Sequence, residues 1–125
     1  MKAFTIDRSK WLRGEGDGDS ALLRPRDGKM CCLGFYLESC GLTPAQLEGR
    51  DAPSEVVNAP ESAEWLYDSA GALRLQHKRV QSDVCMQLMD INDSESEDAE
   101  DREAFITKAF AEQGIKVTFV NGASQ

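Results

Sequence analysis

Hydrophobic and polar residues alternate near both ends of the chain. At the start, Phe4 and Ile6 are separated by Thr5 and followed by Asp7, which predicts a short strand with one buried face. Residues 115–120, with the sequence Ile-Lys-Val-Thr-Phe-Val, alternate in the same way and predict a final strand. Because the two terminal strands can share one sheet, we expect an α+β domain.

Two pairs of apolar runs flank turn signals and predict hairpins. Residues 21–24 and 29–32 flank Pro-Arg-Asp-Gly at 25–28, and residues 65–67 and 72–75 flank Asp-Ser-Ala-Gly at 68–71. We therefore expect a mainly antiparallel sheet with hairpins, packed against about three to four helices. A chain of 125 residues can bury such a core as a single domain, residues 1–125, without disulfide bonds.

Helical spacing of apolar residues predicts helices over residues 33–40, 43–48, 80–91 and 98–113. Gly41 fits the end of the first helix, and Thr43 followed by Pro44 fits the start of the second.

The last two helices have the clearest apolar faces. The apolar stripe of the third consists of Val80, Val84, Leu88 and Ile91, with Cys85 and Met89 beside it. In the fourth, acidic residues occupy the first turn, Gly114 follows the end, and the expected buried face is Phe105, Ile106, Ala109 and Phe110.

Acidic residues outnumber basic ones, and the excess is local. The 22 Asp and Glu and 14 Lys and Arg give a net charge of −8, of which −6 falls in residues 90–125, while residues 1–50 carry +1. Eight acidic residues lie between Asp90 and Glu103. Because a surface with this acid excess repels phosphate, we expect no direct binding of nucleic acid.

The acidic stretch predicts a solvated linker over residues 92–101, since like charges at this density repel one another. Its carboxylates can steer the domain onto a basic surface and pair with Arg and Lys there. Proteins that bind nucleic acids commonly have such surfaces. The alternative is a charge run that only favours solubility. The candidate partner-binding residues of this stretch are Glu95, Glu97, Asp98, Glu100 and Asp101.

A second candidate contact segment is the glycine-rich stretch 13–20, where three glycines in five residues predict a flexible loop. Its acids Glu15, Asp17 and Asp19 would repel a phosphate, and the Lys-Ser/Thr ending of a nucleotide-binding loop is absent. The loop is either an arm that orders on a partner, through these three acids, or a plain connector.

The adjacent cysteines Cys31 and Cys32 are weak candidates for thiol chemistry. They lie where the first hairpin meets a helix, and a thiolate near a helix N-terminus is nucleophilic. The only histidine, His77, lies on a different segment, so no base is evident from the sequence. Cysteine is also among the most often buried residue types, and we favour burial for this pair.

The sequence matches the ligand patterns of known metal sites poorly. The cysteines and His77 lack the C-x-x-C and H-x-x-x-H spacings of zinc sites. The stretch from Asp90 resembles a calcium loop with Asn92, Ser94, Asp98 and Asp101 as further ligands, but Glu95 stands where glycine is usual. We expect no metal and no cofactor.

No run of roughly 18 apolar residues predicts a membrane span. The first residues, Met1 to Asp7, contain no apolar stretch of signal-peptide length. We therefore expect a cytoplasmic protein with reduced thiols and no contact with membranes.

Several stretches together resemble a group of small bacteriophage and prophage proteins of undescribed function: residues 11–16, 22–24, 27–35 (Asp-Gly-Lys-Met-Cys-Cys-Leu-Gly-Phe), 53–58, 91–93 and 117–120. The resemblance brings no catalytic residues. It implies a genomic setting in which small acidic proteins often bind and block a host enzyme, including CRISPR effectors and other nucleic-acid machines, in the host cytoplasm.

Three functional hypotheses follow. The first, which we favour, is a non-catalytic phage protein that blocks a host protein by occupying its basic surface with the acidic stretch. The second is an enzyme or metal-binding protein built on Cys31 and Cys32. The third is a component of the phage particle or of its assembly.

Overall fold

The computed structural model describes residues 2–12, 21–56, 59–67, 81–94 and 98–121. These hold two strands, β1 (Lys2–Asp7) and β2 (Ile115–Val120), and four α-helices, α1 (Cys32–Ser39), α2 (Pro44–Leu47), α3 (Asp83–Asp93) and α4 (Ala99–Ala111). Three short 3-10 helices, η1 (Arg8–Lys10), η2 (Pro53–Glu55) and η3 (Glu61–Leu66), complete them. The mixture of helix and strand confirms the α+β class.

The two strands pair with each other, as expected, but they run parallel. Lys2 pairs with Ile115 and Asp7 with Val120, so the register is continuous along both strands. The expected alternation holds, since Phe4 and Ile6 face the core from β1 and Ile115 and Val117 face it from β2. A parallel pair needs a long crossover, and here the whole chain between the strands supplies it.

The prediction of a mainly antiparallel sheet with hairpins is wrong. The Pro25–Gly28 turn does form, with Gly28 N–H donating to Arg24 O at 2.8 Å. Two backbone bonds join its arms, from Arg24 N–H to Lys29 O at 2.8 Å and from Cys31 N–H to Ala21 O at 3.1 Å, but neither arm is a strand, and both arms also bond to other segments. Leu12 N–H donates to Met30 O, and Leu22 N–H donates to Arg50 O, each within 2.8 Å. Because Met30 O and Leu22 N–H are bonded elsewhere, the pairing of the two arms does not extend into a regular antiparallel ladder.

The second expected hairpin is also absent in its first arm. Trp65 and Leu66 belong to η3, which begins after Pro60, and they pack on the core rather than in a strand. The other arm, residues 72–75, lies outside the described residues.

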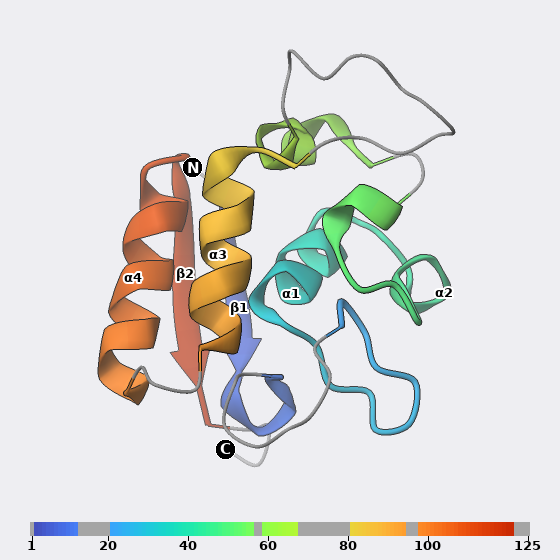
Figure 1. Cartoon of the computed structure of the whole chain (residues 1–125), viewed down its shortest axis with the longest axis horizontal. Coiled ribbons are helices and arrows are strands. Elements are labelled where there is room, and N and C mark those ends of the chain that lie inside the picture. Colours follow the sequence, from blue (N-terminus) through green and yellow to red (C-terminus); the bar gives the residue numbers. More distant parts are fainter. Residues whose placement is uncertain (1, 13–20, 57–58, 68–80, 95–97, 122–125) are drawn as a thin grey trace.

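Helices cover the strand pair. Figure 1 shows α3 and α4 side by side and running in opposite directions, with α1 next to α3. Contacts join α4 to β2 and α1 to β1, while α3 contacts both α1 and α4. Gly114, with a positive φ of 78°, makes the turn from α4 into β2, as expected for a glycine after a helix.

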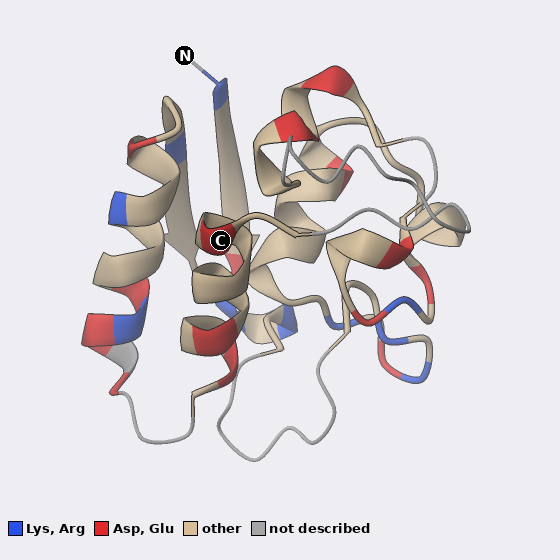
Figure 2. Cartoon of the chain, turned by 45° about the horizontal axis from the view of Figure 1, so that its top comes forward, with Lys and Arg blue, Asp and Glu red and all other residues tan. Residues whose placement is uncertain are grey.

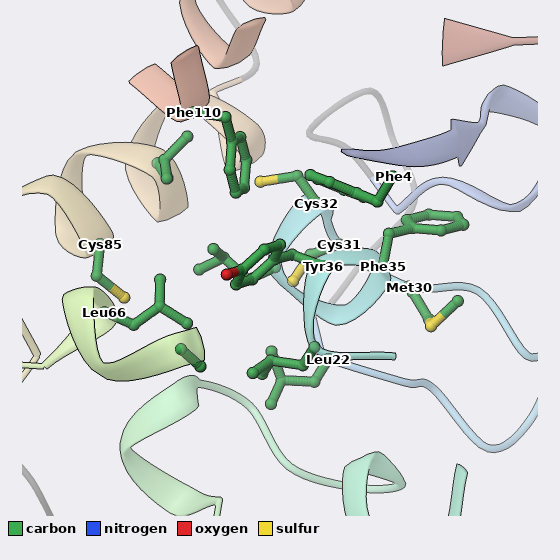
Figure 3. Packing of buried hydrophobic residues seen from close by; sticks show 14 of the residues in the cluster. Phe4, Leu22, Met30, Cys31, Cys32, Phe35, Tyr36, Leu66, Cys85 and Phe110 are labelled. Atoms are coloured by element: carbon green, nitrogen blue, oxygen red, sulfur yellow. The ribbon is translucent and has the colours of Figure 1, made fainter. Parts of the chain in front are cut away.

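Aromatic rings fill the centre of the core. Phe4, Tyr36 and Phe110 pack against one another with ring centroids 4.9–5.4 Å apart, and Trp65 contacts Tyr36 and Phe110 at 5.4 Å. Cys31, Cys32 and Cys85 belong to the same buried cluster, and Figure 3 shows Cys32 beside Phe4 and Phe110 and Cys85 beside Leu66. Burial of these large apolar side chains favours folding.

Gly34 allows α1 to approach the segment that precedes it. A methyl group at this position would overlap the carbonyl oxygen of Leu22 and press on Met30. Only glycine fits such a close contact between a helix and a neighbouring backbone. The contact fixes α1 against residues 21–22.

Two expected helix faces are rotated or interrupted. On α3 the buried residues are Cys85, Leu88 and Asn92, whereas Val84 and Ile91 are only half-buried; Val80 lies outside the described residues. On α4 the expected Ile106, Ala109 and Phe110 are buried, but Phe105 is 38% exposed. The fully buried residue one turn before Ile106 is Arg102.

Candidate partner-binding surface

The start of α4 is a capped helix N-terminus that presents carboxylates. Asp98 is the N-cap, and its side chain accepts from Asp101 N–H at 2.9 Å. Glu100 and Asp101 lie in the first turn, and all three side chains are exposed. The cap and the favourable interaction of acids with the helix dipole stabilise the first turn of α4, whose backbone carries these carboxylates.

The end of α3 lies beside this start and adds two carboxylates. Asp90 and Asp93 are exposed on the last turns of α3, and Figure 2 shows acidic residues gathered at the adjoining ends of α3 and α4. We call the five exposed residues the acidic junction: Asp90, Asp93, Asp98, Glu100 and Asp101. Both ends of the expected solvated linker over 92–101 are helical, because α3 extends to Asp93 and α4 begins at Ala99. Residues 95–97 of that linker lie outside the described residues.

Two arginines near the acidic junction, Arg8 and Arg102, bond to other groups of this chain. Arg102 is fully buried, and its guanidinium donates from Nε to Ile91 O at 3.2 Å and from Nη2 to Ser94 O. It thereby adds a donor to the carbonyls at the C-terminal end of α3, where a helix leaves its last C=O groups short of N–H partners. Because Arg102 is buried, it presents no positive charge to solvent.

Arg8 forms a two-pronged ion pair with Glu103. Its Nε and Nη2 donate to the two carboxylate oxygens at 2.8 and 2.7 Å. The hydrogen bond to Glu103 raises the pKa of Arg8, with a smaller contribution from the opposite charge. Glu103 is thereby committed to this ion pair, and we leave it out of the acidic junction.

Asn92 ties the end of α3 to the start of α1. Its Oδ1 accepts from Trp11 Nε1 at 2.8 Å and from Cys32 N–H at 3.0 Å, and its Nδ2 donates to Leu12 O at 2.8 Å. The side chain is 1% exposed, so these bonds form away from water. Asn92 therefore caps α1 from a distant part of the chain and fixes the end of α3, where the acidic junction lies.

Cys31 and Cys32 occupy the N-cap and first position of α1, as their place in the sequence suggested, but both side chains are buried. Burial raises the pKa of Cys31 to about 11 and that of Cys32 well above its usual range, and nearby backbone N–H groups only partly offset this. Burial likewise raises the pKa of Cys85 to about 12. These thiols are protonated at neutral pH, which works against nucleophilic chemistry.

The structure does not form the calcium loop that the sequence resembles. Asp90 and Asn92 lie on a helix, and every polar atom of the Asn92 side chain is bonded within the protein. Within the described ranges, no three or more His, Cys, Asp or Glu side chains are grouped so as to hold a metal ion.

Several candidates lie outside the described residues: Glu15, Asp17 and Asp19 of the glycine-rich loop, Glu95 and Glu97 of the acidic stretch, and His77. Of the predicted partner-binding residues, the structure places Asp98, Glu100 and Asp101, and it brings them together with Asp90 and Asp93. Sequence reasoning missed Asp90 and Asp93 because the sequence does not show that the end of α3 lies beside the start of α4.

Comparisons with protein-family models, with curated proteins and with solved structures found no match. Among the helices of the described residues, none combines the length and the apolar character needed to cross a membrane.

Proposed function

We propose that this protein is a non-catalytic binding protein whose acidic junction occupies a basic surface on a partner protein. The observation that carries the proposal is the gathering of exposed carboxylates at the adjoining ends of α3 and α4, where Arg102 is buried. Carboxylates held in this way can form charge-assisted hydrogen bonds with Arg and Lys and accelerate association by electrostatic steering.

The fold supports this role by fixing the two helix ends that carry the carboxylates before any partner arrives. Asp98 fixes the first turn of α4, and the Arg102 bonds to Ile91 O and Ser94 O join that helix to the end of α3. A binding group that is already ordered loses less conformational entropy on association. The resemblance to bacteriophage and prophage proteins suggests the biological setting, in which the protein would block a host protein such as a nucleic-acid-binding defence effector.

The test is affinity capture from a lysate of the organism that carries the gene, followed by identification of the captured protein. The test variant neutralises three exposed carboxylates as D90N/E100Q/D101N, and the matched control neutralises three exposed carboxylates elsewhere as E38Q/D51N/E61Q. Asp98 is left unchanged because its loss would also remove the α4 cap.

We expect the wild type and the control to capture the same partner and the test variant to lose it, with both variants melting within a few degrees of the wild type. Capture should also weaken as salt rises, because exposed charge pairs are screened. Equal capture by the two variants contradicts the proposal.

A further inference from the structure

A hollow lies between α3 and α4, towards the start of α3 and the end of α4. Its lining residues are Val84 and Gln87 on α3 and Phe105, Lys108, Ala109 and Glu112 on α4, and its volume is about 230 Å³. Phe105 is 38% exposed, although sequence periodicity places it on the buried face of α4. A large aromatic ring left half in water between two helices is a candidate contact point for a partner.

The size of the hollow indicates what it can hold. Pockets that enclose small-molecule ligands usually measure about 300–1,000 Å³. At about 230 Å³ the hollow falls below that range and fits one or two side chains of another protein better than a whole ligand. In protein interfaces, apolar side chains that fill such hollows are often hot spots, the residues that contribute most of the binding free energy.

The charge around the hollow is mostly negative. Lys108 and Glu112 line it and are opposite in sign, whereas Asp83 and Asp90 lie one turn on either side of Gln87, and Asp101 lies one turn before Phe105. All three of these flanking carboxylates are exposed. Three apolar side chains, Val84, Phe105 and Ala109, share the lining with polar ones and are flanked by acids. This arrangement matches a segment that carries apolar residues on one face and basic residues on both sides of it.

From this charge complementarity we propose that the α3–α4 hollow receives the apolar anchor of a basic amphipathic helix on the partner protein. A third helix can lie along the groove between two antiparallel helices, with side chains at positions i, i+3 or i+4 and i+7 facing the groove. Lys and Arg beside that face would then pair with Asp83, Asp90 and Asp101. This inference rests on the proposed function and names the partner surface that the acidic junction would meet.

The test uses a fluorescently labelled synthetic helix of Leu and Lys with its leucines at i, i+3 and i+7, and a scrambled peptide of the same composition. Binding of both is measured by anisotropy to the wild type, to F105A and to M86A. Met86 is the matched control because it is 51% exposed on α3 but does not line the hollow. A fourth protein, D90N/D101N, tests the contribution of charge.

We expect F105A to weaken binding of the amphipathic peptide by about tenfold or more, as for an interface anchor, while M86A leaves it within about twofold of the wild type. The scrambled peptide should bind weakly to every protein. Equal affinities for F105A and M86A, equal affinities for the two peptides, or no binding to the wild type would each overturn the inference.

The outcomes separate this inference from the proposed function. If D90N/D101N weakens both peptides equally and F105A changes neither, the carboxylates bind basic groups without the hollow, so the inference fails and the proposed function stands. If D90N/D101N binds the amphipathic peptide as the wild type does, the charge argument shared by both proposals is contradicted. If sedimentation shows that the wild type self-associates and F105A does not, a second copy of this chain occupies the hollow and the inference is overturned.

Discussion

The N-termini of α1 and α4 are both candidate sites, and the fold treats them in opposite ways. At α1, the N–H of Cys32 is bonded by the side chain of Asn92, and the thiols around it are buried. At α4, the cap is the local residue Asp98, and the carboxylates around it face solvent. The two helix N-termini thus differ in exposure, because one is capped by a distant segment and buried, whereas the other is capped locally and faces solvent.

This difference should be largest in the chemical reactivity of the thiols. Because Cys31 and Cys32 are buried and their thiols have raised pKa values, we expect them to react with iodoacetamide at pH 7 on the order of a thousandfold more slowly in the folded protein than in urea. Cys40, which is only half-buried, should react first. Mass spectrometry of labelled peptides measures each rate, and rapid labelling of Cys31 or Cys32 would reopen the cysteine-based alternative.

Removing the Asn92 side chain, which caps α1 from a distant part of the chain, should destabilise the N-terminus of α1. Asn92→Ala leaves Trp11 Nε1, Cys32 N–H and Leu12 O without this partner in a buried place, and we expect the free energy of unfolding to fall by about 4 kcal/mol. The measurement is urea unfolding followed by tryptophan fluorescence. Asp90→Ala, an exposed change on the same helix, should cost less than about 0.5 kcal/mol. A loss below about 1 kcal/mol for Asn92→Ala would show that water replaces the amide.

A substitution at Gly34, where α1 contacts the backbone of Leu22, should lower the free energy of unfolding nearly as much. Gly34→Ala places a methyl group on the carbonyl of Leu22, so α1 must shift away, and we expect a loss of about 3 kcal/mol. Glu38→Ala, at an exposed position of the same helix, serves as the control for helix propensity in the same unfolding experiment. If Gly34→Ala were as stable as that control, the contact between α1 and residues 21–22 would be looser than described.

The local cap of α4 should matter less. Asp98→Ala removes one exposed hydrogen bond to Asp101 N–H, and we expect the free energy of unfolding to fall by about 1 kcal/mol. Asp98→Ser keeps a side-chain acceptor for this N–H, so we expect it to retain most of the stability. Thermal unfolding measured by circular dichroism compares the two variants. A loss as large as that of Asn92→Ala would mean that the start of α4 is also part of the buried core.

The smallest effect concerns an exposed turn that neither helix start uses. The hydrogen bond from Arg24 lowers the pKa of Asp27 from 3.8 to about 2. Since the folded pKa lies below the unfolded one, the stabilising contribution of Asp27 is present above pH 3.8 and is lost as pH falls towards 2. Asp27→Asn should therefore reduce the dependence of stability on pH in that window, measured by urea unfolding at several pH values. An unchanged pH dependence would show that this ion pair does not contribute.

Local signals predicted the parts of the fold that depend on neighbouring residues. The alternation at Phe4 and Ile6, the Thr43-Pro44 start of α2 and the glycine after α4 all agree with the structure. Each depends on the geometry of a few adjacent residues.

Long-range pairing could not be read in the same way. The residues at 25–28 correctly predicted a turn, but nothing in them indicated that the flanking segments also bond to residues 10–12 and 49–50. The same limit applies to Asn92 and Arg102, which look like surface residues in an acidic stretch yet are buried as partners of distant backbone groups. The candidate site was predicted in part, since Asp98, Glu100 and Asp101 are exposed as expected, whereas the addition of Asp90 and Asp93 required knowing that α3 ends beside α4.

The measurement that tests the central claim most directly is the affinity of the captured partner for the two triple variants, compared side by side with the wild type. The open helix start at α4 predicts that D90N/E100Q/D101N binds at least about tenfold more weakly, while E38Q/D51N/E61Q, with the same change in net charge, binds as the wild type does. Equal affinities for the two variants would contradict the assignment of binding to the acidic junction.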